Sequence, residues 1–79
     1  MKLTYDPRRN IGYLRFHEKT AEVETIRVSD ALNVDLAPDG TVYGIELLNA
    51  NEQLRGDNGG HFVIVNEAVG KTDDIALEI

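Results

Sequence analysis

The 79-residue chain has eight basic and fourteen acidic side chains and a net charge of −6. A chain of this length forms one small domain, here residues 1–79, with a narrow margin of stability. The charge argues against nucleic-acid binding, which needs positive contacts to phosphate. The absence of cysteine excludes disulfides, thiolate zinc sites and thiol nucleophiles. The apolar runs are too short to span a membrane or form a signal peptide, so we expect a cytoplasmic protein.

Apolar and polar residues alternate along most of the chain with the period of two that is typical of β-strands. The alternation predicts strands over residues 2–6, 11–17, 21–29, 31–36 and 41–48, and further strands over 61–66 and around 75–79. Within 21–29 the phase changes, which predicts a β-bulge near Thr25. One or two helical turns are expected at 49–56, where Asn49 and Glu52 have capping-box spacing. The predicted fold class is mainly β, a small antiparallel β-meander of five to seven short strands with one short helix.

The strands at 31–36 and 41–48 predict a central hairpin. Pro38 and Gly40 favour a turn at residues 37–40. A four-residue loop sets Val34 opposite Tyr43 and Leu32 opposite Ile45, with the apolar side chains on one face. A loop one residue shorter breaks this match, so we expect the four-residue loop.

Three segments carry a family resemblance. The first is Tyr5-Asp6-Pro7 followed by Tyr13-Leu14-Arg15-Phe16, and the second is Val28-Ser29-Asp30 followed by Val34-Asp35 and Asp39-Gly40. The third is Gly44-Ile45-Glu46-Leu47-Leu48-Asn49-Ala50. In their order and spacing they resemble the small prokaryotic family named domain of unknown function 2283, over about residues 3–50. The resemblance implies a small β-rich fold and supplies no activity, ligand or catalytic residue. Gly12 stands where the family has an apolar residue, so the resemblance carries less of the argument for how the first hairpin packs.

No motif for catalysis or cofactor binding is recognisable. The central region has four acidic residues, Asp30, Asp35, Asp39 and Glu46. They are too widely spaced along the chain for a divalent metal site. Residues 57–60 lack the lysine and following helix of a phosphate-binding loop. No strained turn presents Ser29 to His17 or His61 as a nucleophile. We therefore expect no catalytic residue, cofactor or metal, and no enzyme.

The charge is unevenly distributed along the chain. Residues 1–21 hold five basic and two acidic side chains, whereas residues 22–79 hold three basic and twelve acidic ones. The favoured function is a non-enzymatic protein-interaction module whose acidic surface binds a protein partner, with a basic protein as the candidate. The expected contact residues lie on the solvent side of the central hairpin, and they are Asn33, Asp35, Val42 and Glu46.

Two alternative functions remain open, a small hydrolase or metal-dependent enzyme that uses the central carboxylates, and a homo-oligomeric structural protein. Apolar side chains also occur on the face opposite the predicted core, and they are Ile11, Tyr13, Val42 and Leu48. Because one face of an antiparallel sheet is normally polar, either the C-terminal segment or a second copy should cover this face. We expect a homodimer, with no nucleic-acid or membrane partner.

Overall fold

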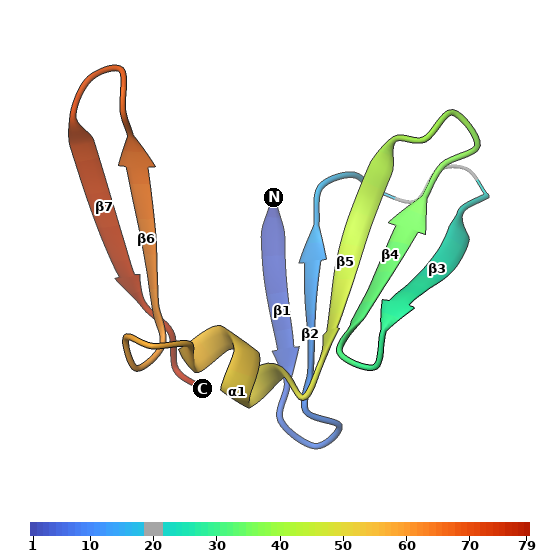
Figure 1. Cartoon of the computed structure of the whole chain (residues 1–79), viewed down its shortest axis with the longest axis horizontal. Coiled ribbons are helices and arrows are strands. Elements are labelled where there is room, and N and C mark those ends of the chain that lie inside the picture. The colour runs from blue at the N-terminus through green and yellow to red at the C-terminus, as the bar shows by residue number, and fades with distance from the viewer. Residues whose placement is uncertain (19–21) are drawn as a thin grey trace.

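The computed structural model describes residues 1–18 and 22–79, and it consists of an antiparallel sheet, a short helix and a separate hairpin (Figure 1). The sheet contains β1 (Lys2–Asp6), β2 (Ile11–Arg15), β3 (Glu24–Ser29), β4 (Leu32–Leu36) and β5 (Val42–Leu48). The helix α1 (Ala50–Arg55) follows, and then β6 (His61–Asn66) pairs with β7 (Lys71–Ala76). The mainly β, antiparallel fold class is confirmed.

The five-stranded sheet has the spatial order β1-β2-β5-β4-β3. It consists of the hairpin β1–β2 and the meander β3–β4–β5, joined by the antiparallel pairing of β2 with β5. The strands β1 and β3 are therefore the two edges of the sheet.

The bulge expected near Thr25 lies elsewhere in β3. The register of β3 against β4 shifts between Arg27 and Ser29, so Val28 is the extra residue. The change of phase before Thr25 marks the start of the strand at Glu24 instead, because Val23 precedes β3. Residue 21, the first of the predicted strand, lies outside the described residues.

The central hairpin differs from prediction in its loop and in its register. The Ala37 N–H donates to the Thr41 carbonyl at 2.9 Å, and the Gly40 N–H donates to the Ala37 carbonyl at 2.9 Å. The loop therefore has three residues, and Gly40 takes the left-handed φ of +89° that such a turn requires. The expected four-residue loop is wrong.

A bulge corrects the register that the shorter loop creates. Leu36 pairs with Val42, whereas Asp35 pairs with Gly44, so Tyr43 is an extra residue in β5. The extra residue shifts the pairing by one, and Val34 then faces Ile45 instead of the expected Tyr43. The burial of apolar side chains explains this arrangement, because a one-residue slip without the bulge would set apolar against polar residues.

One face of the sheet is apolar and carries a continuous row of side chains across all five strands. The pairings place in this row Leu3, Leu14, Ile45, Val34 and Ile26, which we call the apolar row. The helix α1 packs on the same face beside the row, at Gly12. A Cβ atom at Gly12 would lie 3.3 Å from Leu54 Cδ1 and 3.4 Å from the Ala50 Cβ. Gly12 therefore leaves the space that the helix occupies.

The helix α1 is held by the turn between β1 and β2. Asn49 has a left-handed φ of 54°, and its side chain caps no backbone N–H. Asn10 provides the cap instead, because its Oδ1 accepts from the Asn51 N–H at 2.8 Å and its carbonyl accepts from the Ala50 N–H at 3.0 Å. The expected capping box contributes only the contact between Asn49 and Glu52.

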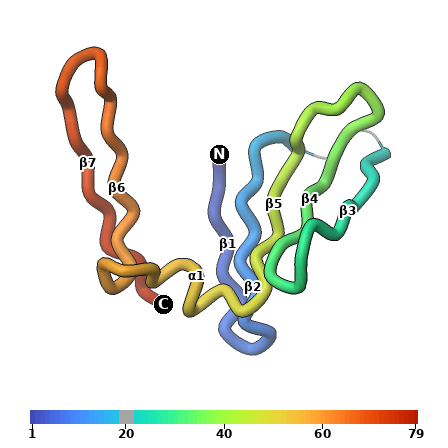
Figure 2. Tube along the Cα trace, in the orientation of Figure 1, coloured from blue at the N-terminus to red at the C-terminus, as the bar shows by residue number. Residues whose placement is uncertain are grey.

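The β6–β7 hairpin stands apart from the sheet, and only α1 and short loops join the two parts (Figure 2). It begins where Gly60 donates to the Arg55 carbonyl at 2.8 Å and accepts from the Leu77 N–H at 2.7 Å. The strand β7 covers residues 71–76, earlier than the expected strand around 75–79, because a turn with a left-handed Gly70 closes the hairpin. The C-terminal segment does not cover the sheet.

Candidate functional site

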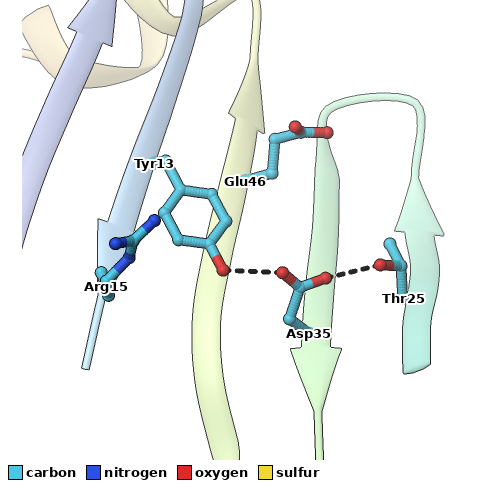
Figure 3. A pocket seen from close by; sticks show the side chains of 5 residues that line it. All are labelled: Tyr13, Arg15, Thr25, Asp35 and Glu46. Atoms are coloured by element: carbon cyan, nitrogen blue, oxygen red, sulfur yellow. Dashed lines mark hydrogen bonds between the residues drawn. The ribbon is translucent and has the colours of Figure 1, made fainter. Parts of the chain in front are cut away.

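Opposite the apolar row, the sheet has a polar face centred on Asp35. Tyr13 extends from β2 across β5, and its hydroxyl donates to Asp35 Oδ2 at 2.6 Å (Figure 3). The Thr25 hydroxyl on β3 donates to Asp35 Oδ1 at 2.6 Å. Asp35, 6% exposed, is therefore a buried residue whose carboxylate lies between hydroxyl groups, contrary to its expected place on the solvent surface.

The position of Tyr13 depends on Gly44. Gly44 lies opposite Asp35 on β5, between Tyr13 and the carboxylate. A Cβ atom at Gly44 would collide with the Tyr13 ring, so any other residue would displace the ring. Because the glycine has no side chain, the tyrosine can cross a whole strand and link β2 to β4.

Arg15 completes a shallow hollow of about 290 Å³ beside this cluster, lined by Tyr13, Arg15, Thr25, Asp35 and Glu46. The guanidinium carbon of Arg15 lies 5.6 Å from the centre of the Tyr13 ring, and Arg15 Nη1 lies 3.3 Å from a carboxylate oxygen of Glu18. Both carboxylate oxygens of Asp35 already accept hydrogen bonds, so the cluster links three strands of the sheet, β2, β3 and β4. This arrangement favours a structural role for Asp35 over catalysis.

The structure separates the four expected contact residues. Asn33 and Glu46 face each other on the polar face, and the Asn33 amide donates to Glu46 Oε1 at 2.9 Å. Val42, 38% exposed, pairs with Leu36 and so lies on the apolar face, because the bulge at Tyr43 shifts it there. Of the four, only Asn33 and Glu46 form an accessible pair on the polar face. Their contact with a partner stays a prediction.

The residues weighed for enzymatic chemistry lie apart. Asp30 pairs with Arg27 in the β3–β4 turn, and Asp39 lies in the β4–β5 turn. His61 is on the separate hairpin, where its Nδ1 lies 2.7 Å from Asp74 Oδ1. Within residues 1–18 and 22–79, no three His, Asp or Glu side chains lie close enough to hold a metal ion. In the same residues, no helix is long and apolar enough to cross a membrane.

A second hollow, which the sequence alone did not reveal, lies where β3 begins beside the β4–β5 turn. It measures about 550 Å³ and is lined by Glu22, Val23, Glu24, Leu36, Ala37, Pro38 and Gly40, which we call the acidic hollow. Its charged lining residues are the two glutamates, and the others are apolar or glycine. Leu36 pairs with Glu24, which brings the start of β3 to the turn. In the sequence, the one indication of this hollow was Val23, whose apolar side chain does not follow the alternation of β3.

The hydrogen bonds of the adjacent turn also make Asp39 a stronger acid. Its pKa lies below the ordinary value of 3.8 because the Thr41 N–H, and then the Thr41 hydroxyl, donate to the carboxylate. The N–H bond measures 2.9 Å. Asp39 is therefore a fixed negative charge at this end of the sheet at neutral pH.

Comparison with known proteins identifies the part of the chain that forms the sheet. No curated protein and no solved structure is significantly similar to the chain. A family model described as a protein of unknown function (DUF2283) matches residues 2–51. The match begins with β1 and ends within α1, so it contains the whole five-stranded sheet and leaves out β6 and β7. Because it spans more than half of the chain, this protein belongs to the DUF2283 family.

Proposed function

We propose that this protein is a non-enzymatic interaction module that binds an extended, basic segment of a protein partner at the acidic hollow. The observation that carries the proposal is an apolar hollow whose charged lining residues are Glu22 and Glu24, beside an unpaired edge strand. Apolar surface surrounded by like charge suits a partner with apolar and oppositely charged side chains.

The edge strand β3 supplies the backbone groups for such a contact. Its outer edge pairs with no strand among the described residues, and all six of its residues are exposed. An extended peptide can add to such an edge through main-chain hydrogen bonds, while alternate side chains enter neighbouring hollows. The start of β3 borders the acidic hollow, so one peptide can use both.

A peptide-binding experiment tests the proposal. The probe is a labelled eight-residue peptide of alternating lysine and valine, with a glutamate–valine peptide as its anionic counterpart. We expect the wild type to bind the basic peptide, and the double variant Glu22→Lys, Glu24→Lys to bind it at least about tenfold more weakly, a loss of about 1.4 kcal/mol. Molar salt should weaken wild-type binding, because exposed charges are then screened within about 3 Å.

The control variant, Glu67→Lys with Glu78→Lys, makes the same change in net charge away from the hollow and should bind like the wild type. Equal binding by the wild type and both double variants would show that general charge attraction, and not the acidic hollow, is responsible. Equal binding of the two peptides by the wild type would also reject the proposal.

A second candidate function, a homo-oligomeric structural protein, is favoured by the uncovered apolar surface of the hairpin and sheet.

A further inference from the structure

The β6–β7 hairpin carries exposed apolar side chains. Every residue of both strands is exposed. The pairing of Phe62 with Ile75 and of Ile64 with Asp73 places Phe62, Ile64 and Ile75 on one face, which we call the hairpin face. A two-stranded hairpin alone in water is marginally stable at best, so this one requires a covering surface.

The apolar row of the sheet is also incompletely covered. None of the five residues in the row is fully buried, and Ile26 at the β3 edge is 40% exposed. The helix α1 covers only the neighbouring part of this face, around Gly12. One chain therefore presents two apolar surfaces, the hairpin face and the apolar row.

The accessible surface and the radius of gyration both exceed the values for a compact chain of this size. Its accessible surface is 5860 Å², whereas a compact folded chain of this mass exposes about 4,800 Å². Its radius of gyration is 14.1 Å, against about 12 Å for a compact domain of this length. The excess of roughly 1,000 Å² per chain exceeds the roughly 800 Å² that each partner buries in a standard stable interface.

We propose that a second copy of this chain covers both surfaces, each hairpin face packing on the apolar row of the other protomer. A two-fold axis makes this exchange reciprocal, so one arrangement buries four apolar surfaces with no further component. A different protein would have to supply two separate surfaces, one for each. Lys71 lies on the hairpin face at the end nearest the turn and provides the polar rim that interfaces commonly have, whereas Asp73 lies in the middle row, opposite Ile64. None of the five residues in the apolar row lines the acidic hollow, so this inference does not rest on the proposed function.

Light scattering coupled to size exclusion at micromolar concentration tests the exchange. We expect the wild type to have twice the chain mass of 8.8 kDa. Phe62→Lys on the hairpin and Ile26→Lys on the sheet should each raise the dimer dissociation constant at least about 30-fold, as loss of an interface hot spot does. Val69→Lys, at a residue 71% exposed in the hairpin turn, is the matched control and should leave the dimer intact.

Mixing the two monomeric variants gives a sharper test. The hairpin of the Ile26→Lys chain and the sheet of the Phe62→Lys chain are both unaltered, so the mixture retains one of the two contacts. We expect the mixture to form mixed dimers at concentrations where each variant alone is monomeric. If Phe62→Lys does not fold, Ile75→Lys on the same hairpin face replaces it.

Three results would overturn the proposal. A wild-type mass of 8.8 kDa with slowly exchanging β6 amides would place the hairpin on its own sheet. A wild-type mass of 8.8 kDa with rapidly exchanging β6 amides would show that no second copy covers the hairpin, and a different protein would then be its partner. A dimer that survives both Phe62→Lys and Ile26→Lys would place the contact between copies elsewhere.

Discussion

Tyr13 and Asp35 show how single residues organise the polar face of the sheet. The tyrosine hydroxyl crosses β5 above Gly44 to reach a carboxylate that is almost fully buried. Burial of such a group is costly unless hydrogen bonds replace its contacts with water. The hydroxyls of Tyr13 and Thr25 supply those bonds, which explains why an aspartate can occupy the centre of the sheet.

The first prediction concerns the Tyr13 hydroxyl. Tyr13→Phe should lower the free energy of unfolding by about 1–3 kcal/mol, because the buried Asp35 carboxylate then loses a hydrogen bond. Urea unfolding measures the change. Tyr5→Phe is the control, because its hydroxyl makes only a long contact of 3.5 Å with Asn10 and should cost much less. Equal losses in the two variants would contradict the assigned role of Tyr13.

The second prediction concerns pH. Because hydrogen bonds from Thr41 lower the pKa of Asp39 in the folded state, the ionised carboxylate stabilises the turn. That stabilisation should be fully present above the ordinary pKa of 3.8 and should disappear as the pH falls through the lower, folded-state pKa. Titration of the side-chain carboxyl carbon by NMR measures the shift. In the variant Thr41→Val, which retains the backbone donor and loses the hydroxyl, the midpoint should rise only part of the way to 3.8.

At the scale of elements, the β4–β5 hairpin and α1 both depend on glycine, for different reasons. Gly40 supplies a left-handed conformation in the turn, whereas Gly12 supplies space beneath the helix. The sequence pattern identifies the first role, because proline and glycine in close succession are typical of a turn. The second role appears only when α1 is placed against β2.

The third prediction tests the turn. Gly40→Val should cost about 1 kcal/mol or more of folding stability, because a β-branched residue is strained at a φ of +89°. Thermal unfolding measures it. A Cβ at Gly40 would meet nothing within 4 Å, so the loss reports backbone strain alone. An unchanged melting temperature would contradict the assigned turn.

The fourth prediction tests the contact between α1 and the sheet. Gly12→Val should lower the stability by about 1–3 kcal/mol, because the added methyl groups would crowd Leu54 and Ala50. Combining it with Leu54→Ala should recover part of the loss, since the longer side chain is then removed. Additive losses in the double variant would show that Gly12 and Leu54 do not share this contact.

At the scale of the whole molecule, the chain has two parts with different stability. The sheet has three interior strands and a helix on its apolar face, whereas the hairpin has two strands whose residues are all exposed. Local unfolding should therefore begin in the hairpin, because it makes few contacts of its own.

The fifth prediction follows from this difference together with the proposed exchange between copies. Dilution below the dimer dissociation constant should accelerate amide exchange in β6 and β7, whereas the amides of β4 and β5 should be affected much less. Hydrogen exchange followed by mass spectrometry at two protein concentrations measures it. Hairpin exchange that is independent of concentration would show that association does not stabilise β6 and β7.

The sequence by itself determined most of the strands, because alternation depends only on neighbouring residues and on which face each side chain occupies. It located β1, β4, β5 and β6 to within a residue or two, the turn at Pro38 and Gly40, and the family of the sheet. The bulge at Tyr43, by contrast, follows from a match between two strands, which local propensity does not contain.

Tertiary structure decided the features that depend on contacts across the chain. Asn10 caps a helix that begins forty positions later at Ala50, and Tyr13 reaches Asp35 over a strand that lies between them. Both contacts exist only because β5 returns to pair with β2. For the same reason Asp35, expected at the surface, is buried, and the acidic hollow forms where β3 meets the distant turn. Alternation assigns a residue to a face of the sheet, whereas the neighbouring strands and side chains decide whether that residue contacts water.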